Sequence, residues 1–431
     1  MDYKQRQNLM MLSWLVWIIV CLGLFFTGFL ILTNWWKLDF KNWGRIFTGL
    51  VLILFGLTVG YLVTLRFFSG ITERLFKRDF WQKSIRSKGP KIVVVGGGTG
   101  LGTILRGLKE ITSNLTAIVT VADDGGSSGR LRHEFGILPP GDIRNCLVAM
   151  ADLEPLMESL MQYRFHGNSG LNGHNFGNLL LTALTDITGD FEAAIKVSSK
   201  VLAVRGQVLP ATREHVVLQA ELEDGTVVNG ESLISKSGSP IRRVKLIPDN
   251  VKPVAEAIAA INEADIILLG PGSLFTSIIP NLLVTEITAA IKAAKAIKVY
   301  ICNAMTQPGE TDNFSASDHI RKIYQHTGPG LIDLAIVNTA SIPAEILDRY
   351  AQENAFPVVA DLDNIKALGI TPIGEELIIK AHVIRHDPAK LATLIENLIR
   401  TKKIEAFCGK FITKYLLSKL KQLPGFLFNL K

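Results

Sequence analysis

The chain has 431 residues, of which 48% are hydrophobic and 20% charged, and this apolar content excludes a disordered or fibrous protein. Four scattered cysteines without CxxC spacing favour buried thiols in a reducing compartment over a disulfide framework or a zinc site. The net charge of +7 combines +15 in residues 1–91 and 401–431 with −8 in residues 92–400. An acidic body with basic flanks favours a protein that lies against a membrane, and it disfavours nucleic-acid binding.

Two uncharged segments near the N-terminus predict a pair of transmembrane helices. Leu9 to Thr33 and Ile46 to Leu65 are each long enough to cross the roughly 30 Å of bilayer hydrocarbon. Lys and Arg are frequent from Arg66 to Lys91, and the positive-inside rule puts that segment in the cytoplasm. We therefore expect a two-pass cell-membrane protein, with a transmembrane hairpin over 1–68, a basic juxtamembrane linker over 69–90 and the main domain, 91–400, in the cytoplasm.

The C-terminal tail, residues 401–431, has the pattern of a basic amphipathic helix. Its apolar positions include Ile404, Phe407 and Phe411, and lysines such as Lys403 and Lys410 lie between them. Such a helix binds to an anionic membrane surface. A helix that docks on the main domain has the same pattern and remains an alternative.

The main domain alternates strands with helices. Strands are predicted at 91–95, 115–121, 265–269, 298–301 and 334–337, and helices at 101–111, 253–261, 285–296, 316–325 and 344–353. Between the two halves lie helical stretches at 141–165 and 174–204, a hairpin over 215–222 and 226–233 around Asp224-Gly225, and a strand at 242–246. This order predicts a Rossmann-like α/β fold with a mostly parallel sheet and an inserted helical and β-hairpin region.

Small and polar residues follow the predicted parallel strands, and the carboxyl ends of such strands form the ligand-binding edge of an open sheet. The loop after the first strand is rich in glycine but lacks the Gly-Lys-Ser/Thr of a P-loop. Asp123, after the second strand, can accept a hydrogen bond from a ribose hydroxyl, so NAD(P) is a competing ligand. The candidate residues at this edge are Gly96, Gly97, Gly98, Thr99, Gly100, Asp123, Gly270, Gly272, Ser273 and Asn303.

Two polar segments inside the inserted region add candidate ligand contacts. Ser127, Ser128 and Arg130 belong to a glycine-rich segment, 125–132, that can offer hydroxyl, guanidinium and amide groups to phosphate. A surface loop with solvated arginines is the alternative. Asn175 and Asn178 can hydrogen-bond a sugar or a base, and helix capping by Asn175 is the alternative, which is favoured for an isolated asparagine.

Three carboxylates form a candidate magnesium site. Asp123, Asp124 and Asp142 are expected at the same edge of the sheet, where they could hold Mg²⁺ between the protein and a diphosphate. Asp142 could instead cap the helix that begins near Ile143. The absence of an HExxH motif from the sequence disfavours a dedicated zinc site.

Six ordered motifs together resemble one known family. They are GGGTGL (96–101), ADDGGSSGRLR (122–132), PPGDIRNCL (139–147), GHNFGNLLL (173–181), GPGSLFTSIIPNL (270–282) and CNAMTQPGET (302–311). In this order they resemble the gluconeogenesis-factor (YvcK-like) family, a branch of the superfamily typified by the 2-phospho-L-lactate transferase CofD. The resemblance covers about residues 91 to 400, and the two N-terminal spans and the basic tail depart from the compact family members.

The resemblance implies a function and two further site residues. It implies a non-catalytic sensor that binds UDP-N-acetylglucosamine, acts on a cytosolic enzyme or wall-synthesis protein, and serves cell-wall precursor supply and cell shape during gluconeogenic growth. Tyr350 and Arg385 match the positions that contact the nucleotide sugar, and the sequence is compatible with a homo-oligomer. The transferase branch implies the alternative, a metal-assisted transfer of a phospholactyl group from a nucleotide diphosphate to a deazaflavin.

Overall fold

The computed structural model describes residues 51, 58, 89–152, 155–168, 170–379 and 383–401. The chain divides into two units, Met1–Ser84 and Ile85–Lys431, and the second contains the predicted main domain. The predicted spans, except Val51 and Thr58, most of the juxtamembrane linker and the tail after Thr401 lie outside the described residues. Among the described helices, none alone combines the length and apolarity of a membrane span, and one bent pair, Leu274–Leu282 with Thr285–Ala293, meets these criteria jointly.

A seven-stranded parallel sheet forms the centre of the second unit. Its strands stand in the order β10-β9-β8-β7-β1-β2-β3, and all neighbouring pairs are parallel. Their bounds are β1 Ile92–Gly96, β2 Leu115–Val119, β3 Gln207–Pro210, β7 Ile266–Leu269, β8 Ile297–Ile301, β9 Leu334–Asn338 and β10 Thr371–Glu375. β1, β2 and β7 are buried along their whole length, which explains their continuous β-branched and leucine composition.

The strand order reverses between β1 and β7. From β1 the chain adds β2 and β3 on one side, and it then returns to add β7, β8, β9 and β10 on the other side. In doubly wound folds, the crevice at the carboxyl ends of two such strands is the usual place for a ligand. The Rossmann-like prediction is thus confirmed, and the topology gives one position for the site.

Helices connect the parallel strands. α4 packs against α6, and α11 packs against α13. The bounds are α4 Gly98–Leu108, α5 Gly126–Phe135, α6 Pro140–Met150, α7 Pro155–Gln162, α8 Phe176–Thr188, α9 Phe191–Val201, α11 Ala255–Glu263, η4 Leu274–Ile278, α12 Ile279–Leu282, α13 Thr285–Ala293, α14 Ala316–Thr327, α15 Ala344–Gln352 and α16 Leu362–Ala367. A final helix covers 388–401. The element η4 is one turn of π-helix, a feature frequent at functional sites.

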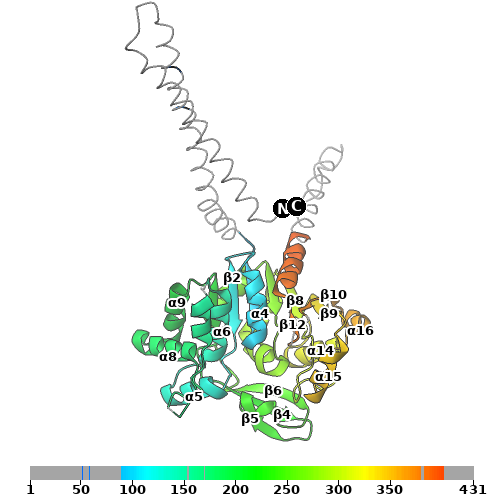
Figure 1. Cartoon of the computed structure of the whole chain (residues 1–431). Helices are drawn as coiled ribbons and strands as arrows, with labels where there is room; N and C mark the ends of the chain where they lie inside the picture. The colour runs from blue at the N-terminus through cyan, green and yellow to red at the C-terminus, as the bar shows by residue number, and fades with distance from the viewer. Residues whose placement is uncertain are drawn as a thin grey trace, which may run out of the picture. The chain divides into compact units, whose positions relative to one another are not determined.

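The inserted β region is a small antiparallel sheet at one end of the parallel sheet (Figure 1). It contains β4 Val217–Leu222, β5 Val227–Asn229 and β6 Ile241–Ile247, with the short helix α10 Glu231–Ile234 between β5 and β6. The predicted hairpin around Asp224-Gly225 and the strand at 242–246 are confirmed. A separate two-stranded ribbon joins β11 Ile378–Ile379 to β12 Arg385–His386.

Several boundaries differ from the predictions. The segment 125–132, whose alternative was a surface loop, lies almost entirely in α5, where Ser127, Ser128 and Leu131 are buried. The stretch 174–204 is two helices, because Gly189 ends α8 in the left-handed region and Asp190 caps α9. The second hairpin strand stops at Asn229, and α10 follows it. β3 and β10 were not predicted.

Candidate ligand-binding site

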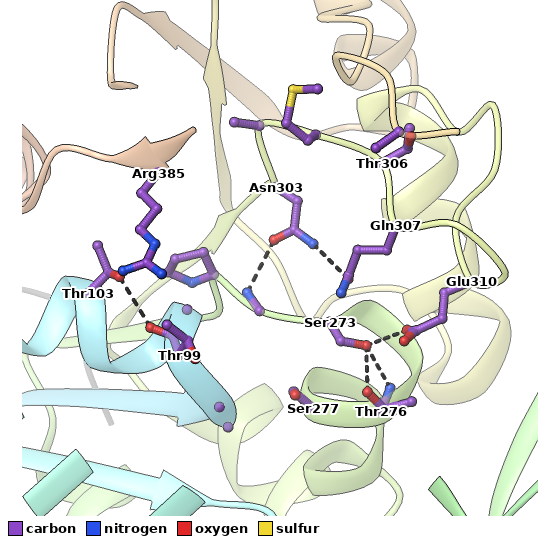
Figure 2. A pocket seen from close by; sticks show the side chains of 18 of the residues that line it. Thr99, Thr103, Ser273, Thr276, Ser277, Asn303, Thr306, Gln307, Glu310 and Arg385 are labelled. Atoms are coloured by element: carbon purple, nitrogen blue, oxygen red, sulfur yellow. Dashed lines mark hydrogen bonds between the residues drawn. The ribbon is translucent and has the colours of Figure 1, made fainter. Parts of the chain in front are cut away.

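A cavity of about 670 Å³ opens at the carboxyl ends of the parallel strands, where the strand order reverses. A volume of this size is in the usual range for small-molecule sites. Its walls come from the loops after β1, β7 and β8, and from α10, α15 and β12. Figure 2 shows these walls from close by, with Arg385 on the side of α4 and Ser273, Thr276 and Glu310 on the other side.

The N-terminus of α4 borders the cavity. Its N-cap is Gly97, Gly98 adopts a φ of +65°, and the Gly98 backbone N–H donates to the Asp142 carboxyl group. A Cβ atom at residue 97 would lie 2.5 Å from Oδ2 of Asp142. Glycine is therefore required here, and the helix dipole and the N–H groups that follow Gly98 suit an anion such as a phosphate group.

The loops after β1 and β7 pack together as one rigid base. A Cβ atom at Gly100 would lie 2.6 Å from the Pro271 carbonyl oxygen, so the two backbones are in direct contact. Asn281, whose side chain is fully buried, donates from Nδ2 to the carbonyl oxygens of Gly96, at 2.9 Å, and Ser277, at 2.7 Å. These contacts hold η4 and the glycine loop at a fixed separation.

Hydroxyl and carboxyl groups cover the N-terminus of η4. The Ser273 hydroxyl donates to Glu310, and its oxygen accepts from the Thr276 backbone N–H at 3.1 Å and the Thr276 hydroxyl at 2.7 Å. Asn303 accepts from the Gly272 N–H at 3.2 Å and donates to Gln307 at 3.3 Å. Figure 2 shows both groups of contacts on the cavity wall. The polar atoms here are fixed before a ligand arrives.

Carboxyl groups are frequent in the cavity, and burial changes their acidity. Burial, with the nearby Asp123 charge, raises the pKa of Asp142 and the pKa of Glu231 to about 7 each. Burial is also the main reason why the pKa values of Asp123 and Glu310 are raised. In the described part of the chain, none of these four groups forms an ion pair with Lys or Arg. An anionic ligand therefore needs compensation from elsewhere.

Arg385 is the one Lys or Arg among the described residues that line the cavity. No hydrogen bond or ion pair from a described residue engages its guanidinium group. Its neighbour Ile384 donates its backbone N–H to the Tyr350 hydroxyl at 2.8 Å, and Tyr350 lies under the Arg349 guanidinium at 5.8 Å. Ile384 and Tyr350 form a small apolar cluster with Ala304 and Ile378, and this cluster supports β12 at the cavity wall.

The structure brings part of the predicted site together. The predicted residues that line the cavity are Gly97, Gly98, Thr99, Gly100, Asp123, Asp142, Gly272, Ser273, Asn303, Tyr350 and Arg385. Those that do not line it are Gly96, Asp124, Ser127, Ser128, Arg130, Asn175, Asn178 and Gly270. The ligand-binding roles themselves remain predictions.

The predicted residues outside the cavity have structural partners. Asn178 donates to Ser127 at 3.2 Å and accepts from the buried Arg144 at 2.9 Å. Asn175 accepts from the Asn178 N–H and so caps α8, which confirms the capping alternative. Arg130 donates to the carbonyl oxygen of Asn172 at 2.8 Å. These side chains join α5, α6 and α8 behind the cavity wall.

The three predicted magnesium ligands are not gathered at one point. Asp124 accepts from the Ser232 N–H at 2.8 Å and faces α10, whereas Asp123 and Asp142 line the cavity. Asp142 is in the first turn of α6 but its N-cap is Pro139, so the capping alternative is wrong. Throughout the described ranges, no set of three His, Cys, Asp or Glu side chains has the arrangement of a metal site.

Sequence reasoning missed several cavity residues. Glu231 enters from α10, which was predicted as part of a strand, and Glu310, Thr276 and Gln307 were not assigned a role. Glu310 and Gln307 belong to the quoted motif CNAMTQPGET, and Thr276 belongs to GPGSLFTSIIPNL. A search for polar residues inside those motifs would have found these three residues. No sequence signal points to Glu231.

Comparisons with known proteins agree with this architecture. Residues 92–378 match the family model of the 2-phospho-L-lactate transferase CofD. A gluconeogenesis factor of Bacillus subtilis is 54% identical over 312 residues, which are 72% of this chain and 98% of the relative. The gluconeogenesis factor of Halalkalibacterium halodurans is 52% identical over 316 residues, covering 73% and 98% of the two chains.

A solved structure is similar over the same region. The crystal structure of a UPF0052 family member from Bacillus halodurans matches with a TM-score of 0.69 and 52% identity, and the match covers 71% of this chain and 98% of that chain. At 52% identity, this match supports membership of the same family as well as the same fold. The chain therefore belongs to the CofD family, in its gluconeogenesis-factor branch.

Proposed function

We propose that the cavity binds a nucleotide sugar, UDP-N-acetylglucosamine. One observation carries this proposal. The N-terminus of α4 and the guanidinium of Arg385, which no described residue engages in a hydrogen bond or ion pair, border the same cavity, where both can bind a diphosphate. The rest of the cavity is rich in hydroxyl, amide and carboxyl groups, which suit the hydroxyls of a sugar and a ribose.

The proposed role is regulatory rather than catalytic. The chain would act as a membrane-anchored, cytoplasm-facing factor in cell-wall precursor supply and cell shape under gluconeogenic growth. Its partner would be a cytosolic enzyme or a wall-synthesis protein that responds to the ligand-bound form. The sequence relation to gluconeogenesis factors supports this role, and the predicted spans at 9–33 and 46–65 support the anchor.

Calorimetric titration of the full-length chain in detergent tests the proposal. The ligands are UDP-N-acetylglucosamine, NAD(P) and GTP, each with and without Mg²⁺, and the products are analysed after each titration. We expect saturable binding of the UDP-sugar without turnover. Binding of NAD(P) in place of the UDP-sugar, or no binding of the UDP-sugar under any condition, would refute the proposal.

The second candidate is a transferase of the 2-phospho-L-lactate type. The match of residues 92–378 to the CofD model favours it. Such an enzyme would consume a nucleotide-diphosphate-activated substrate in a metal-dependent reaction, with a deazaflavin as acceptor. Formation of a new product from a nucleotide diphosphate in the titration would select this candidate over the sensor.

Mg²⁺ fits either candidate as a bridge to the ligand. Asp123 and Asp142, two of the three predicted ligands, line the cavity, and neither has an ion-pair partner in the described part of the chain. Because Mg²⁺ commonly takes one or two carboxylates and completes its shell with phosphate oxygens and water, these two residues would hold it. Bound there, the ion would neutralise the diphosphate charge in a cavity that contains several carboxyl groups.

A further inference from the structure

The cavity has two chemically different ends. On the side of α4, the guanidinium of Arg385 and the backbone N–H groups after Gly98 offer hydrogen-bond donors and positive charge, and the Gly98 N–H itself donates to Asp142. On the other side, Figure 2 shows Ser273, Thr276 and Glu310 grouped together. The first end therefore suits an anion. The second end presents hydroxyl and carboxyl groups, so it suits a different part of the ligand.

Two glutamates flank the hydroxyl pair at the second end. Glu310 accepts the hydrogen bond of the Ser273 hydroxyl, and Ser273 in turn accepts from the Thr276 hydroxyl at 2.7 Å. Glu231, which comes from α10, is also hydrogen-bonded to the Thr276 side chain. Both glutamates line the cavity, so their carboxyl groups and the two hydroxyls form one continuous polar surface.

The backbone around Glu231 is held from two sides. The Asp124 carboxylate accepts the N–H of Ser232, the next residue, at 2.8 Å. On the other side, Gly309 packs so closely on the Ser235 carbonyl oxygen that a Cβ atom there would lie 2.2 Å from it. These contacts therefore hold α10, and with it Glu231, at a defined position on the cavity wall.

The charge at this end is negative and uncompensated. Within the described ranges, neither Glu231 nor Glu310 forms an ion pair with Lys or Arg. Burial raises both pKa values, that of Glu231 to about 7, and the nearby Asp123, Glu310 and Asp142 carboxyls contribute to the Glu231 shift. A further carboxylate brought by a ligand would meet repulsion that grows as the pH rises.

We propose that Glu231 and Glu310 form the subsite for the sugar and that they select a neutral, hydroxyl-rich sugar over one that carries a carboxylate. This inference rests on the proposed binding of a nucleotide sugar. With the diphosphate at α4 and Arg385, the sugar reaches the two glutamates, whose oxygens accept hydrogen bonds from its hydroxyls. The same surface disfavours a carboxylate-bearing phospholactyl group, and so it favours the sensor over the transferase.

The test compares UDP-glucose with UDP-glucuronate, because these ligands differ only in the oxidation of the sugar C6. The full-length chain in detergent is titrated with each ligand at about pH 6 and about pH 8, and UDP-N-acetylglucosamine is titrated in parallel. We expect UDP-glucuronate to bind at least about tenfold more weakly than UDP-glucose at the higher pH. The difference in affinity between the two ligands should be smaller at the lower pH, because Glu231 takes up a proton there.

Substitution of the two glutamates completes the test. In the double variant Glu231→Gln, Glu310→Gln we expect UDP-glucuronate to approach the affinity of UDP-glucose at both pH values. The matched control is Glu221→Gln, because Glu221 lies in the same inserted sheet, pairs with Arg242 and does not line the cavity. It should keep the wild-type preference. The pH comparison in the wild-type chain remains decisive if the double variant does not fold.

Two outcomes separate the inference from the proposed function. Binding of UDP-N-acetylglucosamine together with equal affinities for UDP-glucose and UDP-glucuronate at about pH 8 would overturn the sugar subsite and leave the nucleotide-sugar proposal standing. Failure of all three UDP-sugars to bind would overturn both.

Discussion

The hydroxyl oxygen of Tyr350 accepts the backbone N–H of Ile384 at 2.8 Å, directly beside Arg385. This bond joins α15 to β12 across the cavity rim. Ile384 is buried, so its N–H would lose its partner if the hydroxyl were absent. Tyr350 thus has a positioning role for Arg385 that does not require stacking on the ligand.

The variant Tyr350→Phe tests this positioning role, because it keeps the ring and removes the hydrogen bond. A lost bond to a buried group costs about 1–3 kcal/mol, so we expect UDP-N-acetylglucosamine to bind about fivefold to hundredfold more weakly. Isothermal titration calorimetry measures the change. Tyr163→Phe is the control, because Tyr163 is 48% exposed and does not line the cavity. Wild-type affinity in Tyr350→Phe would assign the role to the ring alone.

Arg385 supplies positive charge to the cavity without supporting the fold through an ion pair in the described chain. We expect Arg385→Ala to weaken nucleotide-sugar binding about tenfold to hundredfold, as for a lost charge-assisted contact, with little change in the melting temperature. Titration calorimetry and thermal unfolding measure the two effects. Arg242→Ala is the matched control, since Arg242 pairs with Glu221 outside the cavity. A large fall in stability would argue for a structural role instead.

Gly100 and Gly102 belong to the same helix but differ in the space around them. A Cβ atom at Gly100 would lie 2.6 Å from the Pro271 carbonyl oxygen, whereas the nearest contacts at Gly102 are 3.7 Å. We expect Gly100→Ala to separate the two cavity loops, to cost about 1–3 kcal/mol of unfolding free energy and to weaken ligand binding. Gly102→Ala should be neutral or slightly stabilising, because alanine favours a helix. Urea denaturation and titration measure both variants, and similar effects in the two would contradict the packing argument.

Stability should depend on pH through Asp142. The pKa of this carboxyl is raised from its ordinary value of 3.8 to about 7 by burial and by Asp123. Between these values the folded chain keeps a proton that the unfolded chain has released. The free energy of unfolding therefore falls as the pH rises through this window, and it levels off above about pH 7.

Replacement of the carboxyl isolates this effect. We expect the unfolding free energy of Asp142→Asn to depend less on pH. At about pH 8 it should be about 1–3 kcal/mol higher than in the wild type, because no buried charge forms. Urea denaturation at a series of pH values measures it. Asp363→Asn is the control, since the Asp363 side chain is 97% exposed. An unchanged pH profile in Asp142→Asn would show that other groups cause the fall.

Variants of Asn175 distinguish a structural role of this residue from a ligand contact. Its side chain accepts the Asn178 N–H and caps α8, so Asn175→Ala should cost about 1 kcal/mol of unfolding free energy. Asn175→Asp retains an N-cap acceptor, so it should keep most of the unfolding free energy that Asn175→Ala loses. Because Asn175 does not line the cavity, we expect an unchanged Kd for the nucleotide sugar in both variants. A weaker Kd at unchanged stability would restore the predicted ligand contact.

Local chemistry was enough to predict much of the parallel sheet and its ligand-binding edge. Buried runs such as Ile92–Gly96 and Ile266–Leu269 have a continuous apolar composition, and glycines follow each of them. β3 and β10 escaped prediction because they are the two edges of the sheet. Edge strands tolerate residues such as Pro210 and Pro372, which obscure the strand signal.

The sequence by itself determined the fold class, the glycine loop and the polar residues at the strand ends, because hydrophobic periodicity and turn preference act over a few residues. The tertiary structure alone decided which side chains line the cavity. In the folded chain Ser127 and Asn178 belong to a buried hydrogen-bond network. Glu231 lies at the site because its neighbour Ser232 bonds to Asp124, 108 residues away along the chain. Contacts over such distances depend on how the inserted sheet packs, and no local pattern encodes that packing.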